Sequence, residues 1–380
     1  MADVLITNGT VVTPDAVLDP GWLTVRDGRI TEVGAGTPMP IGLRRVDAHG
    51  GWILPGFVDI HCHGGGGGSF AGQGVEGVVT TIETHRTRGT TTMLASLVSR
   101  PVPELAKQIA ELAELVTDGL LAGIHLEGPF LAAARCGAHD PAVLRPPDRE
   151  TVDTLLDTGR GTVRMVTLAP ELDGAVEAVR RLAGAGVLAA IGHTDAIEAQ
   201  VRPAIEAGAR VATHLFNGMR PLHHREPGPI GALLDDDRVS IELICDLVHV
   251  HPTAVRLAHA GAGPGRMVLV TDAIAAAGAG DGRYDIGGLD VTVRDGVPTL
   301  AGGAALAGSS LTMDAAFRNL VRECGIPVLD AVAATSAHPA ALLGLGGETG
   351  KLAPGLAADV VILDAAMHPV SVMSKGAWVD

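Results

Sequence analysis

The sequence has 380 residues, 47% of them hydrophobic and 19% charged, which excludes a disordered chain and indicates a large buried core. Its net charge is −15, and no basic patch carries interleaved aromatic residues, which argues against nucleic acid and anionic membranes as partners. A small anionic substrate is still compatible with this charge, because a few Arg and His residues can form a local positive pocket.

Targeting signals and cysteine spacing indicate the cellular location of the protein. The first residues, MADVLITNGTVV, lack a basic segment followed by an apolar one, so no signal peptide is expected. Apolar stretches are interrupted well before the roughly 18 residues of a membrane span. The four cysteines lack the CxxC spacing of a metal site, so we expect reduced thiols in a cytoplasmic protein.

Both ends of the chain are rich in predicted strands. In the first fifty-odd residues, apolar residues are interrupted by NG, DG and GG turns, which is typical of hairpins. The segment 358–379 repeats this pattern near the C-terminus. We therefore expect a small β-sandwich domain built from residues 1–55 together with 355–380.

The middle of the chain has a different pattern. Between Gly56 and about Gly350, apolar strand-like runs alternate with Ala-rich helical stretches. The runs lie at residues 56–63, 91–98, 120–127, 163–170, 187–193, 210–216, 240–246 and 267–272. Eight strand–helix units in roughly 300 residues predict an α/β fold, a (β/α)8 TIM barrel over residues 56–354.

A doubly wound open sheet is the alternative fold for alternating strands and helices. It would show a GxGxxG fingerprint after its first strand and an acidic residue about twenty positions later. The glycines at 64–68 follow a strand but do not fit this fingerprint. The barrel is therefore the preferred prediction.

Polar residues end most of the predicted strands. They are His61, His63, Glu127, His193, His214, Asp246 and Asp272. In a barrel the carboxyl ends of all strands meet on one face, where catalysis takes place. Six of the eight runs carry such a residue, which is more than scattered structural histidines would give.

The pair His61 and His63 begins the expected metal site. Residues two apart on a strand point to the same side, here the mouth of the barrel. Neutral imidazole is the commonest metal ligand in proteins. Alone, an HxH pair is a weak signal, but the other polar residues on the same rim supply ligands for one or two divalent ions.

Several sequence motifs resemble those of a known family. PGFVDIHCHG, AAIGHTD, ATHLFNGM and LVTDAI resemble the metallo-dependent amidohydrolase superfamily, which has a (β/α)8 barrel and a small β-domain made from both chain ends. More narrowly, HLEGPF, GAHDP, DLVHVHP and LAGSSLTMD closely resemble the N-acetylglucosamine-6-phosphate deacetylases, nearly end to end. The resemblance implies deacetylation of N-acetyl-D-glucosamine 6-phosphate in amino-sugar catabolism or cell-wall recycling, with the galactosamine epimer as the alternative substrate.

Lysine is scarce, and this bears on the metal ligands. Many members of the superfamily bridge two metals with a carbamylated lysine, but no lysine lies between Lys107 and Lys351. Glu127 is then the expected bridging or anchoring ligand. The resemblance implies that Glu127, His193 and His214 hold the metal found throughout the family.

The number and identity of the ions stay open from sequence. The resemblance implies that His61 and His63 hold a second ion, as they do in some members, so one or two ions per subunit are expected. Zn is the first choice, and Fe, Mn, Co and Ni are alternatives because nitrogen and oxygen donors suit all of them.

The expected mechanism is hydrolysis by metal-activated water. A bound divalent metal lowers the pKa of water to about 7. Asp272 is placed to accept the water proton and to pass it to the departing amine, with a role as metal ligand alone as the alternative. His139 resembles the family histidine that hydrogen-bonds the acetyl carbonyl, and a structural loop histidine is its alternative.

Binding of a sugar phosphate needs local cations. Arg225 offers the planar guanidinium suited to phosphate, and His249 is the second candidate. The resemblance implies that Asn217 and Gly218 bind sugar hydroxyls and phosphate, and that Arg225 reaches the neighbouring active site in a homodimer. It also implies a loop that closes over the sugar, formed by Leu306, Ala307, Gly308 and Ser309, for which a helix-capping turn is the structural alternative.

Two other functions are alternatives for the same residues. A cyclic-amide or aminoacyl hydrolase on the same barrel fits poorly, because the bridging lysine is missing. A catalytically inactive scaffold would have lost metal ligands, whereas every expected ligand is present. A metal-dependent amide hydrolase is therefore the prediction.

Overall fold

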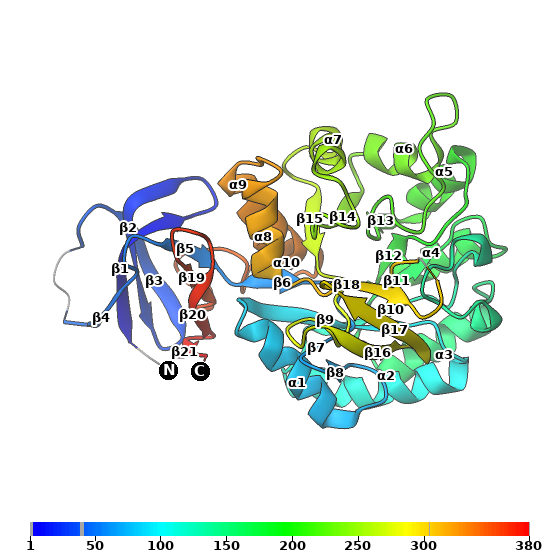
Figure 1. The fold of residues 1–380 in the computed structure, drawn as a ribbon, viewed down its shortest axis with the longest axis horizontal. Helices are drawn as coiled ribbons and strands as arrows, with labels where there is room; N and C mark the ends of the chain where they lie inside the picture. The colour runs from blue at the N-terminus through cyan, green and yellow to red at the C-terminus, as the bar shows by residue number, and fades with distance from the viewer. Residues whose placement is uncertain (1–2, 39–41, 304, 380) are drawn as a thin grey trace. The chain divides into compact units, whose positions relative to one another are not determined.

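The computed structural model describes residues 3–38, 42–303 and 305–379 (Figure 1). Within them the chain divides into two compact units. The first comprises the residues up to Asp59, Glu83–Thr92 and the residues from Thr312 onwards. The second comprises Ile60–Ile82 and Met93–Leu311, and it contains all the side chains that the sequence assigns to the site.

An eight-stranded parallel sheet runs in the order β15-β14-β13-β12-β11-β10-β9-β6. Its strands are β6 (Phe57–Asp59), β9 (Thr90–Val98), β10 (Gly123–Glu127), β11 (Val163–Leu168), β12 (Leu188–Ile191), β13 (Ala209–Ala212), β14 (Ser240–Ile244) and β15 (Met267–Val270). Each strand lies within or overlaps one of the eight predicted runs, so the predicted strand succession is confirmed. The strands are almost entirely buried, which is why they read as continuous apolar runs.

The two ends of this sheet come together beyond its strands. The Asp272 N–H donates to the His61 carbonyl at 2.8 Å, and the His63 N–H donates to the Ala273 carbonyl at 2.8 Å. The segment after β15 is thereby hydrogen-bonded to the segment after β6. The sheet curves round to form a near-closed barrel, and this closure brings Asp272 beside the HxH pair.

Helices follow the strands of the second unit. They are α2 (Val102–Thr117), α3 (Arg149–Gly159), α4 (Ala175–Gly184), α5 (Glu198–Ala207), α6 (Gly228–Asp235) and α7 (Pro252–Ala262), while α1 (Gly74–Arg86) runs from one unit into the other. The spacing of buried residues explains α2, where Leu105, Ile109 and Leu112 form one apolar stripe. Asp148 begins α3 by accepting a hydrogen bond from the Thr151 N–H at 2.9 Å.

A three-stranded antiparallel sheet follows β15 and was not predicted. It consists of β16 (Gly282–Ile286), β17 (Leu289–Arg294) and β18 (Val297–Leu300). Its apolar side chains form a buried cluster with Val98, Ile274 and Ala307. The sheet therefore packs beside the carboxyl ends of β9 and β15, next to the predicted substrate loop. A second small hairpin pairs β7 (Gly64–Gly65) with β8 (Gly68–Ser69).

The first unit contains one eight-stranded sheet that uses both ends of the chain, in the order β21-β20-β19-β5-β1-β2-β3 with β4 paired to β1. Its strands are β1 (Val4–Val12), β2 (Val17–Arg26), β3 (Arg29–Ala35), β4 (Arg44–Asp47), β5 (Trp52–Pro55), β19 (Val360–Leu363), β20 (Pro369–Ser374) and β21 (Ala377–Trp378). In Figure 1 the blue and red ends of the chain meet in this sheet. The same unit contains α8 (Met313–Arg322), α9 (Val328–Val332), η3 (Ala333–Ala337) and α10 (His338–Leu342). In the described part of the chain, no helix is both long and apolar enough to span a bilayer.

Candidate metal centre and active site

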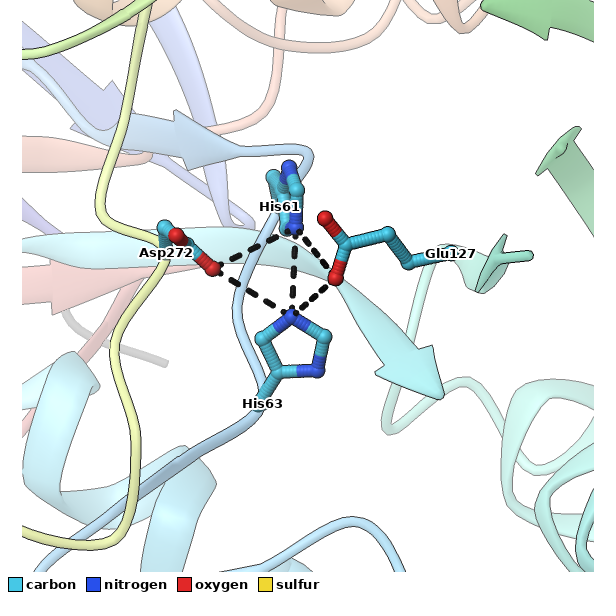
Figure 2. A group of neighbouring side chains, drawn as sticks. All are labelled: His61, His63, Glu127 and Asp272. Atoms are coloured by element: carbon cyan, nitrogen blue, oxygen red, sulfur yellow. Dashed lines mark hydrogen bonds and ion pairs between the residues drawn. The ribbon is translucent and has the colours of Figure 1, made fainter. Parts of the chain in front are cut away.

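Four buried side chains converge where the barrel closes (Figure 2). His61 and His63 approach each other with their Nε2 atoms 3.2 Å apart. Glu127 Oε2 lies 3.1 Å from His63 Nε2 and 3.5 Å from His61 Nε2. Asp272 Oδ1 lies 3.3 Å and 3.4 Å from the same two nitrogens. All four ligand atoms are within 4.8 Å of one another, which is the donor set of a divalent metal site.

A second pair of imidazoles faces the other oxygen of the same glutamate. Glu127 Oε1 lies 3.0 Å from His193 Nε2 and 3.0 Å from His214 Nε2. Those two nitrogens are 3.1 Å apart. One carboxylate thus lies between two histidine pairs, which is the position required of a bridging ligand.

The hydrogen bonds behind three of the four rings show that these histidines fit a metal. The Nδ1 atoms of His63 and His193 lie 3.1 Å and 2.8 Å from the carbonyls of Ser96 and Arg135. A carbonyl can only accept, so each Nδ1 carries the proton and each Nε2 presents its lone pair to the site. His61 is oriented in the same way, because its Nδ1 lies 3.3 Å from a carboxylate oxygen of Glu242.

His139 has the opposite orientation of donor and acceptor. The Ser99 N–H donates to its Nδ1 at 3.2 Å, so the proton is on Nε2, which lies 3.4 Å from Glu127 Oε2. Burial lowers the pKa of His139, which favours the neutral ring. Although Glu127, His139 and His193 are close enough to form a metal site, His139 presents an N–H there. His139 therefore presents a hydrogen-bond donor at the cavity and not a lone pair for a cation.

Substitution of His139 separates these two roles. We expect His139→Ala to lower kcat by about 10²–10³-fold, the effect of losing one donor to a developing oxyanion, while bound metal per chain is unchanged. Steady-state kinetics and elemental analysis of the purified variant measure both quantities. The exposed His49→Ala serves as the control. Loss of metal from His139→Ala would identify His139 as a ligand instead.

Mutual electrostatics organise the centre. Burial raises the pKa of Asp272, but the neighbouring imidazoles of His61 and His63 outweigh it and lower the pKa of Asp272 to about 2. Burial also raises the pKa of Glu127. The neighbouring imidazoles of His61 and His139 outweigh burial and hold that pKa well below its ordinary value. Both carboxyl groups are therefore ionised at neutral pH, as a cation site or a general base requires.

The backbone of three site residues is strained. His193, His214 and Asp272 have φ values of 46°, 29° and 49°, in the left-handed region that non-glycine residues rarely occupy. Such conformations cost on the order of 1–3 kcal/mol each and persist where surrounding contacts impose them, typically at functional sites. All three lie two residues beyond the end of a barrel strand, where the chain must turn to direct each side chain into the mouth of the barrel.

A cavity of about 250 Å³ opens beside the metal ligands. Its lining residues are Glu127, Gly137, Ala138, His139, His193, His214, Asn217, Gly218, His249, Asp272, Ile286, Ala305, Leu306 and Gly308. The predicted ligands and substrate residues on this list are therefore brought together. None of these lining residues is Lys or Arg.

Three of the predicted substrate residues lie outside this lining. Arg225 is exposed, with its guanidinium 2.7 Å from His224 Nε2. Ala307 is fully buried. Ser309 is also buried, and its Oγ donates to the Thr271 carbonyl at 2.6 Å while its N–H donates to the Asp272 carbonyl at 2.8 Å. Ser309 thus supports the strained backbone of Asp272 from behind.

The sequence prediction missed several residues that organise the site. Ser96 orients His63 through its backbone carbonyl, which leaves no trace in the sequence. Ser99 contacts His139 Nδ1 through both its N–H, at 3.2 Å, and its Oγ, at 2.9 Å. Ile286 reaches the cavity from the unpredicted β16. Glu242 could have been found, because it is a lone carboxylate inside the otherwise apolar strand SIELI and is completely buried.

Comparison with known proteins shows which family the chain is similar to. The amidohydrolase family matches residues 52–379. A mutant N-acetyl-D-glucosamine-6-phosphate deacetylase from Mycobacterium smegmatis, solved with N-acetyl-D-glucosamine-6-phosphate, is 46% identical, with a TM-score of 0.96 and 100% of each chain covered. The N-acetylgalactosamine-6-phosphate deacetylase of Escherichia coli O157:H7 is 37% identical over 96% of each chain. The N-acetylglucosamine-6-phosphate deacetylase of Bacillus subtilis (strain 168) is 35% identical over 98% of this chain and 96% of its own.

The chain therefore belongs to the amidohydrolase family, whose members are metal-dependent hydrolases. Within that family it belongs to the branch that contains the N-acetylglucosamine-6-phosphate deacetylases. The resemblance that the sequence motifs indicated is confirmed.

Proposed function

We propose that this protein is a metal-dependent hydrolase that removes the acetyl group from N-acetyl-D-glucosamine 6-phosphate, giving glucosamine 6-phosphate and acetate. The observation that carries the proposal is the placement of Glu127 between two histidine pairs, beside a cavity into which His139 points an N–H. The substrate is taken from the names of the relatives, which are N-acetylglucosamine-6-phosphate deacetylases. Amino-sugar catabolism or cell-wall recycling is the corresponding metabolic role.

The residues divide the chemistry of amide hydrolysis between them. His61, His63, Glu127, His193 and His214 would hold one or two divalent ions, with Zn as first choice and Fe, Mn, Co or Ni as alternatives. When bound, such an ion polarises the amide carbonyl and lowers the pKa of water. Asp272 Oδ1 takes a proton from the attacking water while the water oxygen bonds to the acetyl carbon. The same carboxyl group then gives that proton to the amine nitrogen as the C–N bond breaks. His139 donates its Nε2 proton in a hydrogen bond to the carbonyl oxygen as negative charge develops there.

Substrate comparison tests this proposal. We expect acetate release from N-acetylglucosamine 6-phosphate with a kcat/KM at least tenfold above that for unphosphorylated N-acetylglucosamine, because the phosphate contributes binding. Equal values for the two sugars would contradict the phosphate assignment. N-acetylgalactosamine 6-phosphate is the second candidate, favoured by the 37% identity to a deacetylase of that substrate, and a higher kcat/KM for it would reverse the order.

We also propose that His249 binds the phosphate together with Asn217 and Gly218. All three line the cavity, and His249 Nδ1 lies 2.6 Å from Asp246 Oδ2. Burial lowers the pKa of His249, but the hydrogen bond and charge of Asp246 outweigh it, so the pKa is raised. A protonated His249 supplies the cavity with the positive charge that its other lining residues lack.

This assignment predicts how KM depends on pH. Because the pKa of His249 is raised, the ring keeps its charge to higher pH and loses it as the pH rises through that value. We expect KM for the phosphorylated substrate to increase over that range. In Asp246→Asn the same increase should begin at lower pH, whereas His249→Gln should have a high KM that no longer follows this titration. Superimposable KM profiles for the wild type and Asp246→Asn would rule out this role.

We further propose a homodimer in which Arg225 reaches the active site of the neighbouring subunit. Support comes from its exposed position on the loop after β13 and from the absence of any Lys or Arg among the described residues that line the cavity. A guanidinium from outside would complete the phosphate site. The loop Leu306–Ser309 would close over the sugar through Leu306 and Gly308, which line the cavity.

The domain division and location are proposals of the same kind. We propose that residues 1–55 and 355–380 form a β-sandwich and that residues 56–354 form the barrel domain. The sheet shared by both chain ends supports the first part, since it has its own cluster of buried apolar side chains, including Val4, Leu23 and Val360. Four scattered cysteines without the CxxC spacing of a metal site support a reducing, cytoplasmic environment.

A further inference from the structure

Glu242 is a buried carboxylate to which the reaction gives no role. It lies in the middle of β14, between Ile241 and Leu243, and its side chain is completely shielded from solvent. It is absent from the residues that line the cavity. A carboxylate in an apolar interior is costly unless it is hydrogen-bonded, so its contacts indicate why it is there.

One oxygen of Glu242 contacts both halves of the metal centre. Oε2 lies 3.3 Å from His61 Nδ1 and accepts a hydrogen bond from the backbone N–H of His214 at 3.2 Å. His61 belongs to the HxH pair, and His214 belongs to the pair on the other side of Glu127. Oε1 has no hydrogen-bond partner among the described residues.

The contacts of Glu242 with His61 and with the His214 N–H have different effects. The carboxylate behind His61 keeps the proton on Nδ1, fixes the plane of the ring and increases the basicity of Nε2, as in carboxylate–histidine–metal arrangements. Behind His63 and His193 there are backbone carbonyls, which carry no net charge. The contact to the His214 N–H instead braces a backbone held at a φ of 29°. The HxH half of the centre is therefore the half whose ligand basicity depends on a removable charge.

We propose that Glu242 is a positioning residue for the metal centre, and that it enables the His61/His63 half to retain its ion. The inference rests on the proposed function only in taking the cluster to be a metal site. It assigns no contact between Glu242 and substrate. The half formed by Glu127, His193 and His214 keeps all its side-chain ligands when Glu242 is changed.

Metal binding alone tests the proposal, with Mn²⁺ as the probe and no substrate present. The wild type is expected to bind two ions per chain and to give the spin-coupled electron paramagnetic resonance signal of a Mn²⁺ pair. In Glu242→Gln, we expect the weaker of the two Kd values to rise by about 10–100-fold and the coupled signal to disappear at matched Mn²⁺. The tighter ion should remain.

Two further variants separate positioning from a general effect on β14. Ile244→Val alters the same strand two residues away, on the side that Glu242 faces, and should leave both Kd values and the coupled signal unchanged. In a His61→Asn background, Glu242→Gln should cause no further loss of Mn²⁺, because its effect passes through His61. If Glu242→Gln does not fold, Glu242→Asp, which keeps the charge on a shorter side chain, should retain two ions with a weakened second site.

Three results would overturn the inference. They are wild-type Mn²⁺ binding and coupling in Glu242→Gln, equal weakening of both ions, and binding of a single ion by the wild type. Each can occur while the wild type still releases acetate from the sugar phosphate. Failure of this inference is therefore distinguishable from failure of the proposed function.

Discussion

Replacement of Asp272 by asparagine is expected to lower kcat by about 10²–10⁴-fold, which is the usual contribution of a general acid–base group. The amide is nearly isosteric, so the cavity keeps its shape, but it accepts no proton from water and returns none to the amine. The pKa of Asp272 is lowered to about 2, so the wild-type carboxylate is already in its base form across the neutral range. The loss of rate should therefore persist at every pH above about 4.

The measurement for Asp272→Asn is acetate release at saturating substrate, with metal content determined on the same sample. A fall in kcat with both ions retained supports proton transfer by Asp272. A fall in proportion to lost metal would assign Asp272 to metal binding alone, which is the alternative. Asp290→Asn, on the exposed side of β17, is the matched control and should have wild-type kcat.

Glu127→Gln is expected to have the second large effect, because it removes the charge shared by both halves of the centre. Its two oxygens face the Nε2 atoms of the four candidate ligand histidines at 3.0–3.5 Å. Removing one partner of a buried ion pair costs about 3–5 kcal/mol, which corresponds to a loss of metal affinity of roughly 10²–10³-fold or more. Both ions should be weakened, in contrast to the single ion affected by a change at Glu242.

Isothermal titration with Mn²⁺ on metal-free protein measures this effect. Glu111→Gln, on the exposed face of α2, is the control and should bind metal as the wild type does. If Glu127→Gln lost one ion and kept the other at wild-type affinity, Glu127 would be a ligand to one half and not a bridge between the two.

The barrel could be predicted because its strands have a clear pattern in the sequence, apolar runs that end in a polar residue. Strands covered by helices on one side and by the barrel interior on the other are buried on both faces, so they appear as uninterrupted apolar runs. The polar residue that ends each run marks the carboxyl face. This is why Glu127, His193, His214 and Asp272 could be identified from the sequence, and the structure brings them together with the HxH pair.

Other parts of the site could not be predicted, for physical reasons. The groups that orient His63 and His193 are backbone carbonyls, which any residue supplies. The β16–β18 sheet was not predicted, although GG at 287–288 and DG at 295–296 are hairpin turns, because it is an insertion beyond the eight strands that complete the barrel. Glu242 leaves a signal in the sequence, as a lone carboxylate in an apolar strand, but its contact with His61 depends on the closure of the barrel.

The dependence of acetate release on metal, measured in one sample, tests whether the cluster around Glu127 is the catalytic centre. The enzyme is exhaustively chelated, assayed with N-acetylglucosamine 6-phosphate, reloaded with Zn²⁺ or Mn²⁺ and assayed again. We expect the rate to fall to the uncatalysed background on chelation and to return on reloading, with one acetate formed for each amine. A rate that chelation leaves unchanged would contradict the assignment of the cluster around Glu127 as the catalytic metal centre.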